Sequence, residues 1–265
     1  MSPFLSRLAV TLAGLPVVLA LGYLGGWALA VLLLLAALAA LHELYRLARP
    51  LRPLVLAGYG GGAGAILGGQ LGGAEWMLGG FLVVFPLAFV FAAIAETRQS
   101  TTVAIGTTVL GAAWIGLGLG HLILVRDITV QGRQAIFTVM LTVFVTDSVA
   151  YLGGRIAGRH KMTPVMSPGK TWEGFVLGAA AGIFTAWVSV YGTGWADGWR
   201  SFVLGGAVVA AAAIGDLFES LVKRDLGAKD TGRILLGHGG MLDRVDSLLF
   251  AGPAAYYTLV ALGQA

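Results

Sequence analysis

The chain has 265 residues, of which 57% are hydrophobic and 11% are charged, with a mean hydropathy of +0.85. Soluble proteins usually carry about a quarter charged residues, so this composition predicts a membrane protein and excludes a disordered chain. The absence of Cys excludes a disulfide-built secreted domain and a zinc or iron–sulfur site held by thiolates. We interpret the net charge of +4 as a result of membrane topology and expect no nucleic acid partner.

Apolar runs long enough to cross a bilayer, roughly 20 residues each, follow one another along the whole chain. They predict an all-α integral membrane protein with about nine transmembrane helices. The predicted spans are approximately residues 8–23, 27–44, 54–71, 76–95, 102–125, 135–152, 174–191, 202–218 and 247–262. The limits of the first three are the least defined, because glycines separate the first two poorly and the Gly-rich third is also typical of a bent or re-entrant segment.

Nine spans would place the two termini on opposite faces of the membrane. Fourteen of the seventeen Lys and Arg residues then lie on the N-terminal face, and three lie on the other. By the positive-inside rule, the N-terminus and both long polar loops are predicted to be cytoplasmic. A cleaved signal peptide is an alternative for the first apolar run, but this run continues past its Ala28-x-Ala30 cleavage pattern to Leu41.

Glycine patterns recur inside the predicted spans, as in Gly116-x-Gly118-x-Gly120 and Gly178-x-x-x-Gly182. Small residues at this spacing let helix backbones approach closely. We therefore interpret these patterns as helix-packing contacts and not as phosphate-binding loops.

Most charged residues collect in two stretches, residues 147–173 and 216–246. Ionisable groups at a membrane boundary indicate a functional site. In the first stretch, Gly169-Lys170-Thr171 resembles the end of a nucleotide-binding P-loop, but the first glycine of that motif and its strand–helix context are missing. Lys170 and Thr171 are predicted to stand at the start of the seventh helix, where free N–H groups and the helix dipole favour an anion. A purely topological role for the basic residues of this loop is the alternative.

Carboxylates are the notable feature of the second stretch. Asp216 and Glu219 share one helix face near the end of the eighth span, and Asp243 and Asp246 share another as the ninth begins. Because these spans are antiparallel neighbours, we expect Asp216, Asp243 and Asp246 to converge at the cytoplasmic ends of the helices. Such oxygens suit Mg²⁺, which also binds substrate phosphates. Interfacial salt bridges with the neighbouring Lys and Arg residues are the alternative.

The second stretch also carries a recognisable signature of 27 residues. It reads Ser220-x-x-Lys223-Arg224-x4-Lys229-Asp230-x-Gly232, followed by Gly237-His238-Gly239-Gly240-x-x-Asp243-Arg244-x-Asp246. This pattern resembles the phosphatidate cytidylyltransferase (CDP-diacylglycerol synthase) family. The segments Ser167-Pro168-Gly169-Lys170-Thr171-x-Glu173-Gly174 and Asp147-Ser148-x-Ala150-Tyr151 extend the likeness over about the C-terminal half. Leu236 departs from it, because the family usually has Pro there.

The resemblance implies a Mg²⁺-dependent membrane nucleotidyltransferase that converts CTP and phosphatidic acid to CDP-diacylglycerol and pyrophosphate in phospholipid biosynthesis. It also allows a second, monovalent cation and a homodimer. The phosphatidate phosphate is already an oxyanion near neutral pH, so positioning and charge neutralisation would suffice for the reaction. The enzyme is expected in the inner, cytoplasmic membrane, with its polar site facing the cytoplasm at the ends of the C-terminal helices.

Residue roles follow from the residue types together with the resemblance. The expected metal ligands are Asp216, Asp243, Asp246 and Asp147. The expected catalytic cations that contact phosphates are Lys170, Lys223, Arg224 and Arg244. The expected substrate-binding residues are Ser167, Thr171, Ser220, Lys229, His238, Gly239 and Gly240.

We expect a single polytopic domain over residues 1–265, with less specific hydrophobic helices in 1–125 and the catalytic helices and loops in 135–262. Three other classes of protein are less consistent with the sequence. A transporter would place charges near the bilayer midplane, and a scaffold protein would not require two charged loops. A CDP-alcohol phosphotransferase would carry a D-G-x-x-A-R-x8-G-x3-D-x3-D pattern, which is absent.

Overall fold

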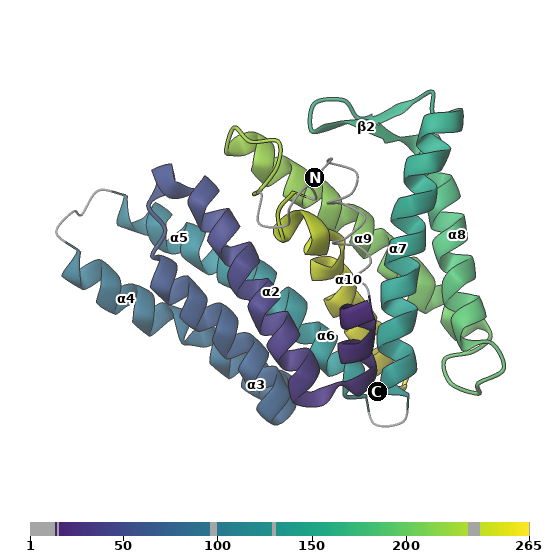
Figure 1. Ribbon diagram of the computed structural model, residues 1–265, viewed down its shortest axis with the longest axis horizontal. Helices are drawn as coiled ribbons and strands as arrows, with labels where there is room; N and C mark the ends of the chain where they lie inside the picture. The colour runs from purple at the N-terminus through teal and green to yellow at the C-terminus, as the bar shows by residue number, and fades with distance from the viewer. Residues whose placement is uncertain (1–13, 15, 96–99, 129–130, 233–238, 265) are drawn as a thin grey trace. The chain divides into compact units, whose positions relative to one another are not determined.

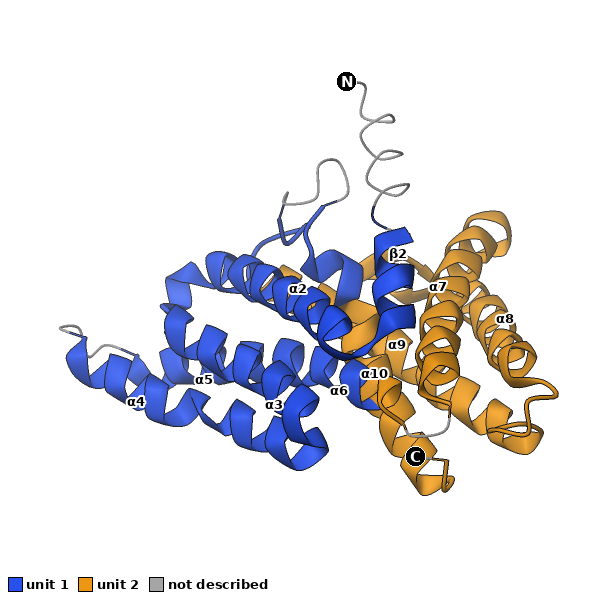
Figure 2. Ribbon diagram, turned by 60° about the horizontal axis from the view of Figure 1, so that its bottom comes forward, with its two compact units in different colours: residues 1–124, 226–245 blue, residues 125–225, 246–265 orange. Residues whose placement is uncertain are grey.

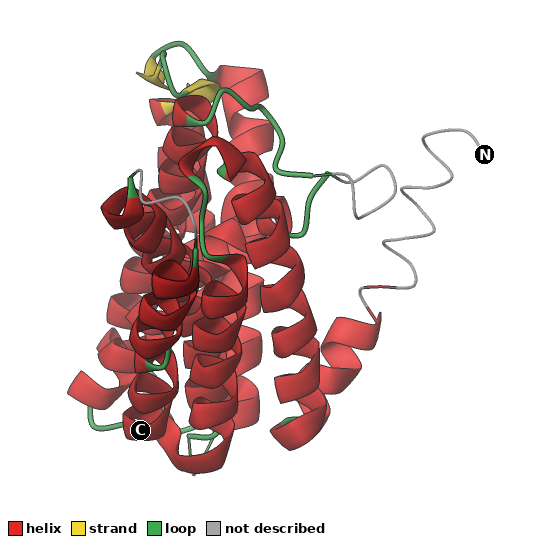
Figure 3. Cartoon of the chain, turned by 90° about the vertical axis from the view of Figure 1, so that its left-hand side faces the viewer, coloured by secondary structure: helices red, strands yellow, loops and turns green. Residues whose placement is uncertain are grey.

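The computed structural model describes residues 14, 16–95, 100–128, 131–232 and 239–264. Within these residues the chain is mostly helical, and one two-stranded hairpin lies between two of the helices (Figure 3). The chain divides into two compact units (Figure 2). The first comprises residues 1–124 and 226–245, and the second comprises residues 125–225 and 246–265.

Six helical segments in the described part of the chain are long and apolar enough to cross a membrane. They are Gly26–Leu47, Val55–Ile94, Thr101–Arg126, Gly132–Ala157, Trp172–Val190 and Trp199–Asp225. These helices agree with the predicted all-α membrane protein. The predicted first span falls partly on residues outside the described set, and the predicted last span lies in a helix that is not one of the six. The number nine and the orientation therefore stay predictions.

The first unit is built from helices (Figure 1), and glycines stand at several of their contacts. Its elements are α2 (Gly26–Leu47), α3 (Val55–Leu82), α4 (Val84–Ile94), α5 (Thr101–Gly111), a π-helical turn (Ala112–Leu117) and most of α6 (Gly118–Arg126). In the predicted Gly116–Gly120 pattern, a Cβ on Gly116 would lie 2.7 Å from Cα of Gly62, and one on Gly120 would lie 2.8 Å from Sδ of Met77. The close packing predicted for this pattern is therefore confirmed at both positions.

Helix α3 contains a reversal of the chain at Gly72 and Gly73. Gly73 adopts φ 73° and ψ −155°, a conformation that side chains other than glycine rarely adopt. Beyond this point the helix packs back on itself, because a Cβ on Gly64 would collide with the backbone of Gly80 and one on Gly68 with that of Trp76. The reversal falls between the predicted spans 54–71 and 76–95.

The second unit contains α7 (Gly132–Ala157), the hairpin of β1 (Lys161–Thr163) and β2 (Ser167–Thr171), α8 (Trp172–Val190) and α9 (Trp199–Asp225). It also contains α10 (Leu242–Ala261) from Asp246 onward. Helices α7 and α8 run side by side (Figure 1), and three glycines of α8 form the contact. A Cβ on Gly178 would lie 2.7 Å from both Ala150 Cβ and the carbonyl oxygen of Thr146. This contact confirms the packing role predicted for Gly178 and Gly182.

The antiparallel hairpin is a correction, because the first polar stretch was expected to be a loop between two helices. Lys161 pairs with Thr171 and Thr163 pairs with Ser167, so the strands are short and contain an irregularity. Pro168 and Gly169 stand within β2, and both residue types weaken a strand signal. The hairpin sequence therefore lacks the alternation of apolar and polar residues from which strands are predicted.

We predict that Gly178→Ala destabilises the protein by about 1–3 kcal/mol, the usual range for overpacking, because the new Cβ would meet the backbone of α7. The matched control is Gly206→Ala in α9, where no described atom lies within 4 Å of the new Cβ. The control should be neutral or stabilising by up to about 1 kcal/mol, because alanine favours a helix. Unfolding of both variants in the same detergent measures the difference, and equal midpoints would contradict the packing argument.

Candidate active site

A cleft of about 600 Å³ opens within the second unit. Its walls come from α7, the β1–β2 hairpin, α8 and α9. Charged side chains of both signs line it, namely Asp147, Arg155, Lys161, Lys170 and Asp216. Two further predicted site residues, Ser167 and Thr171, also lie in its lining. The cleft therefore gathers most of the predicted residues of the first polar stretch.

Lys170 and Asp216 form an ion pair inside this cleft. Nζ of Lys170 lies 2.7 Å from Oδ2 of Asp216, and the two side chains are 24% and 34% exposed. The position of Lys170 follows from its neighbour Thr171, which caps α8 by accepting a hydrogen bond from the Gly174 N–H at 3.2 Å. The cap fixes where β2 ends and α8 begins, and so orients the residue before it.

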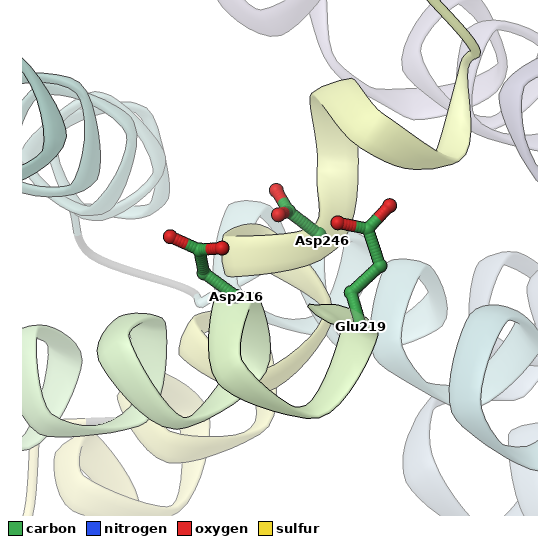
Figure 4. Close-up of side chains that lie close together, drawn as sticks. All are labelled: Asp216, Glu219 and Asp246. Carbon is green, nitrogen blue, oxygen red and sulfur yellow. The ribbon is translucent and has the colours of Figure 1, made fainter. Parts of the chain in front are cut away.

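Asp216 also belongs to a cluster of three carboxylates, with Glu219 on the same helix and Asp246 on α10 (Figure 4). One oxygen from each residue lies within 4.8 Å of the others. Helices α9 and α10 approach closely here, since a Cβ on Gly215 would lie 2.7 Å from the backbone oxygen of Asp246. The rings of Phe218 and Phe250 support the contact with centroids 5.5 Å apart.

The electrostatics of this cluster favour a bound cation. Glu219 is 2% exposed, and its Oε2 accepts a hydrogen bond from Nζ of Lys223 at 2.9 Å. Its Oε1 is buried and accepts no hydrogen bond from any residue that the structure describes. Three carboxylates this close repel one another, and Lys223 and Lys170 offset only part of the charge. The oxygen donors and the unsatisfied buried atom fit a hard divalent cation such as Mg²⁺.

Asp243 has a different environment within the first unit. Its Oδ2 accepts hydrogen bonds from the Gly240 N–H at 2.8 Å, from the Thr231 hydroxyl at 2.9 Å and from the Thr231 N–H at 3.1 Å. These bonds hold the segment that precedes α10. The role of Asp243 as a metal ligand stays a prediction, as does that of Asp147.

The remaining predicted residues stand in different surroundings. Arg224 donates from Nε to the Met166 carbonyl at 3.3 Å and so contacts the turn of the β1–β2 hairpin. Ser220 is half-buried on α9, whereas Lys229 and Arg244 are exposed. Gly239 adopts φ 82°, which favours glycine. His238 lies outside the described residues.

Three charged residues of the described site, Glu219, Arg155 and Lys161, were missing from the predicted set. Glu219 stands one helical turn after Asp216, and this spacing is the signal that could have identified it as a member of the cluster. Arg155 and Lys161 line the cleft, but their positions close to a predicted membrane boundary are equally typical of topological charges.

Comparison with known sequences places this arrangement in a family. The sequence pattern of the cytidylyltransferase family matches residues 5–262, which is nearly the whole chain. The chain belongs to the cytidylyltransferase family. The resemblance stated from the signature residues is thereby confirmed.

Several members of this family are similar in sequence and are named phosphatidate cytidylyltransferase. The one from Mycobacterium bovis is 37% identical over 205 residues, which are 72% of this chain and 65% of the relative. The one from Staphylococcus saprophyticus is 37% identical over 154 residues, 58% of each chain. The one from Brucella abortus is 40% identical over 151 residues, 57% of this chain and 56% of the relative. The chain thus matches less than two thirds of the length of these relatives.

We predict that Mg²⁺ raises the unfolding temperature of the wild-type protein and has little effect on Asp246→Asn. A ligand that binds only the folded state stabilises it, and the substitution removes one carboxylate charge from the cluster. Without Mg²⁺, Asp246→Asn should unfold at the wild-type temperature or above, because the repulsion within the cluster is reduced. The control is Asp225→Asn, an exposed acid on α9, which should respond to Mg²⁺ like wild type. An equal response of all three proteins would contradict the metal site.

Proposed function

We propose that this protein is a membrane nucleotidyltransferase that converts CTP and phosphatidic acid to CDP-diacylglycerol and pyrophosphate. The observation that carries the proposal is the position of Asp216, which lines the cleft and also belongs to the carboxylate cluster. A cation site would thereby border a cleft lined by basic side chains, as transfer between two phosphate-bearing substrates requires. Membership in the cytidylyltransferase family and the names of its relatives support the same reaction.

In the proposed reaction, a phosphate oxygen of phosphatidic acid attacks the α-phosphorus of CTP. A P–O bond forms there, the bond to the bridging oxygen of the β-phosphate breaks, and pyrophosphate leaves with the electron pair. Phosphomonoesters have a second pKa of about 6, so the nucleophile is already ionised near neutral pH. The protein then needs to align the two substrates and offset their negative charge rather than to remove a proton.

The proposed roles of the protein residues follow from this need. Lys170 in the cleft offsets phosphate charge, and its position beside Asp216 keeps it close to the cluster. Lys223 neutralises Glu219, while Arg224 holds the hairpin turn and is also proposed to contact phosphate. Arg244 is proposed as a further phosphate contact.

The metal and the remaining substrate contacts complete the proposal. Mg²⁺ bound by Asp216, Glu219 and Asp246 would supply positive charge next to the triphosphate. Asp243 and Asp147 are proposed as further metal ligands, and a monovalent cation as a second ion. The proposed substrate contacts are Ser167, Thr171, Ser220, Lys229, His238, Gly239 and Gly240.

The proposed setting is the inner membrane, with the cleft facing the cytoplasm, where CTP is made. Fourteen of seventeen basic residues on one side of the predicted topology support this orientation. A homodimer and a single polytopic domain over residues 1–265 are part of the same proposal.

The decisive experiment measures pyrophosphate release by the purified protein in detergent with CTP, phosphatidic acid and Mg²⁺. We expect release only when all three are present, together with formation of CDP-diacylglycerol. Diacylglycerol in place of phosphatidic acid should give none, because it lacks the nucleophilic phosphate. If wild-type protein that binds Mg²⁺ releases no pyrophosphate under these conditions, the proposed reaction is wrong.

We predict that Lys170→Met lowers kcat/KM by about 10²-fold or more and that Lys170→Arg retains a larger part of the activity. Removal of a charge that stabilises the transition state commonly has an effect of about this size, whereas Arg keeps the charge in a different shape. Separate measurements with CTP and with phosphatidic acid varied show which substrate the side chain serves.

The control for Lys170 is Arg159→Gln, which removes a basic charge from the same polar stretch but not from the cleft lining. It should insert and react like wild type. Near-normal activity of Lys170→Met would return Lys170 to a topological role.

A further inference from the structure

Glu43 is a buried carboxylate near the end of α2, in the N-terminal half of the chain. It is 2% exposed and stands among buried apolar residues such as Leu41 and Leu44. An acidic side chain within an apolar membrane helix is unfavourable unless it has a specific partner. Its contacts therefore indicate what keeps it there.

The first partner of Glu43 is the beginning of α10. Oε2 of Glu43 accepts a hydrogen bond from the Leu242 N–H at 2.9 Å, and Leu242 is the first residue of that helix. The first N–H groups of a helix have no partner within it, and the helix dipole favours a negative charge at this end. Glu43 thus caps α10 from a helix that lies 199 positions away in the sequence.

The second partner is the hydroxyl of Thr231, which lies 3.2 Å from Oε2 of Glu43. The same hydroxyl lies 2.9 Å from Oδ2 of Asp243. Thr231 therefore connects the two carboxylates, and Asp243 in turn accepts hydrogen bonds from the backbone of Thr231 and Gly240. Glu43 thus contacts Thr231 and Leu242, the residues at the two ends of the segment 231–242. This segment carries part of the second half of the signature.

The backbone around Glu43 is also fitted to its side chain. A Cβ on Gly240 would lie 2.5 Å from Oε2, and a Cβ on Gly232 would collide with Oε1. Both glycines thus allow the segment to close around the carboxylate. Oε1 is buried and accepts no hydrogen bond from the described residues.

We infer that Glu43 is a positioning residue, which holds Thr231, Asp243 and the first turn of α10 in the geometry needed for nucleotidyl transfer. This inference rests on the proposed function. Asp243 is a proposed metal ligand, and α10 also carries Asp246 of the carboxylate cluster one turn later. Displacement of a positioned group by about 1 Å can lower a rate by about 10²-fold. Glu43 thus connects the N-terminal helices to the reaction through the residues that it positions.

The test compares kcat and KM of Glu43→Ala, Glu43→Gln and Thr231→Val with wild type, all as full-length protein in detergent. Glu43→Ala should lower kcat at least about tenfold and change KM for CTP much less. Glu43→Gln keeps an acceptor oxygen and should retain more activity than Ala. Thr231→Val should lower kcat. In the double variant of Glu43→Ala and Thr231→Val, the second substitution should lower kcat by a smaller factor than it does alone, because both substitutions remove the same connection.

The control is Thr108→Ala, which removes a buried side chain of the same unit that accepts the Leu54 N–H at 2.7 Å and does not contact the signature segment. It should lower stability but leave kcat unchanged. Hydrogen exchange gives a second measurement, in which Glu43→Ala should speed exchange of residues 239–245 and Thr108→Ala should not.

The outcomes separate the positioning role from the proposed function. Normal kcat in folded Glu43→Ala, or a drop of equal size in Thr108→Ala, would overturn the positioning role while leaving the proposed function intact. Inactive wild-type protein would contradict the proposed function. Independently of activity, unchanged hydrogen exchange at residues 239–245 in Glu43→Ala would overturn the anchoring by Glu43.

Discussion

The carboxylates of Asp216, Glu219 and Asp246 converge because α9 and α10 approach each other at a distance that leaves no room for a Cβ at Gly215. In a bilayer, helices associate through close packing rather than through exclusion of water. Small residues at the contact therefore set how far apart the polar groups of neighbouring helices lie. The close approach of α9 and α10 at Gly215 therefore contributes to the geometry of the acidic cluster.

The same constraint shapes the cleft of the second unit. Gly174 and Gly178 bring α8 against Ala150 and Thr146 of α7, and Asp147 and Tyr151 stand beside these contacts and line the cleft. The short hairpin then joins the ends of the two helices and carries Lys170 to Asp216. Helix packing through glycine thus determines the cleft walls, and the ion pair forms where the hairpin meets α9.

The parts of this arrangement that could be predicted are those encoded by local periodicity. Hydrophobic runs predicted the helices, and the spacing of Gly178 and Gly182 predicted their packing, because both features repeat along one element. The placement of Asp216 and Asp246 in neighbouring polar helix ends was also apparent from the sequence.

Other features depend on contacts that local patterns do not contain. The β1–β2 hairpin has strands too short and irregular to alternate, so no period indicated it. Glu219 was visible on the face of Asp216, but its burial and its pairing with Lys223 arise from tertiary packing. Glu43 had one local signal, a charge in an apolar helix, while its partners Thr231 and Leu242 lie 188 and 199 positions away.

These long-range contacts connect the N-terminal half of the chain to the signature segment. The signature that resembles phosphatidate cytidylyltransferases does not lie in one unit, because residues 226–245 group with the N-terminal helices and Ser220 to Arg224 group with α9. The N-terminal spans carry none of the signature residues, yet Glu43 from α2 caps the helix on which the signature ends. A hydrophobic segment with no motif of its own can therefore determine where catalytic groups stand, provided that it contributes one well-placed acceptor to a free helix end.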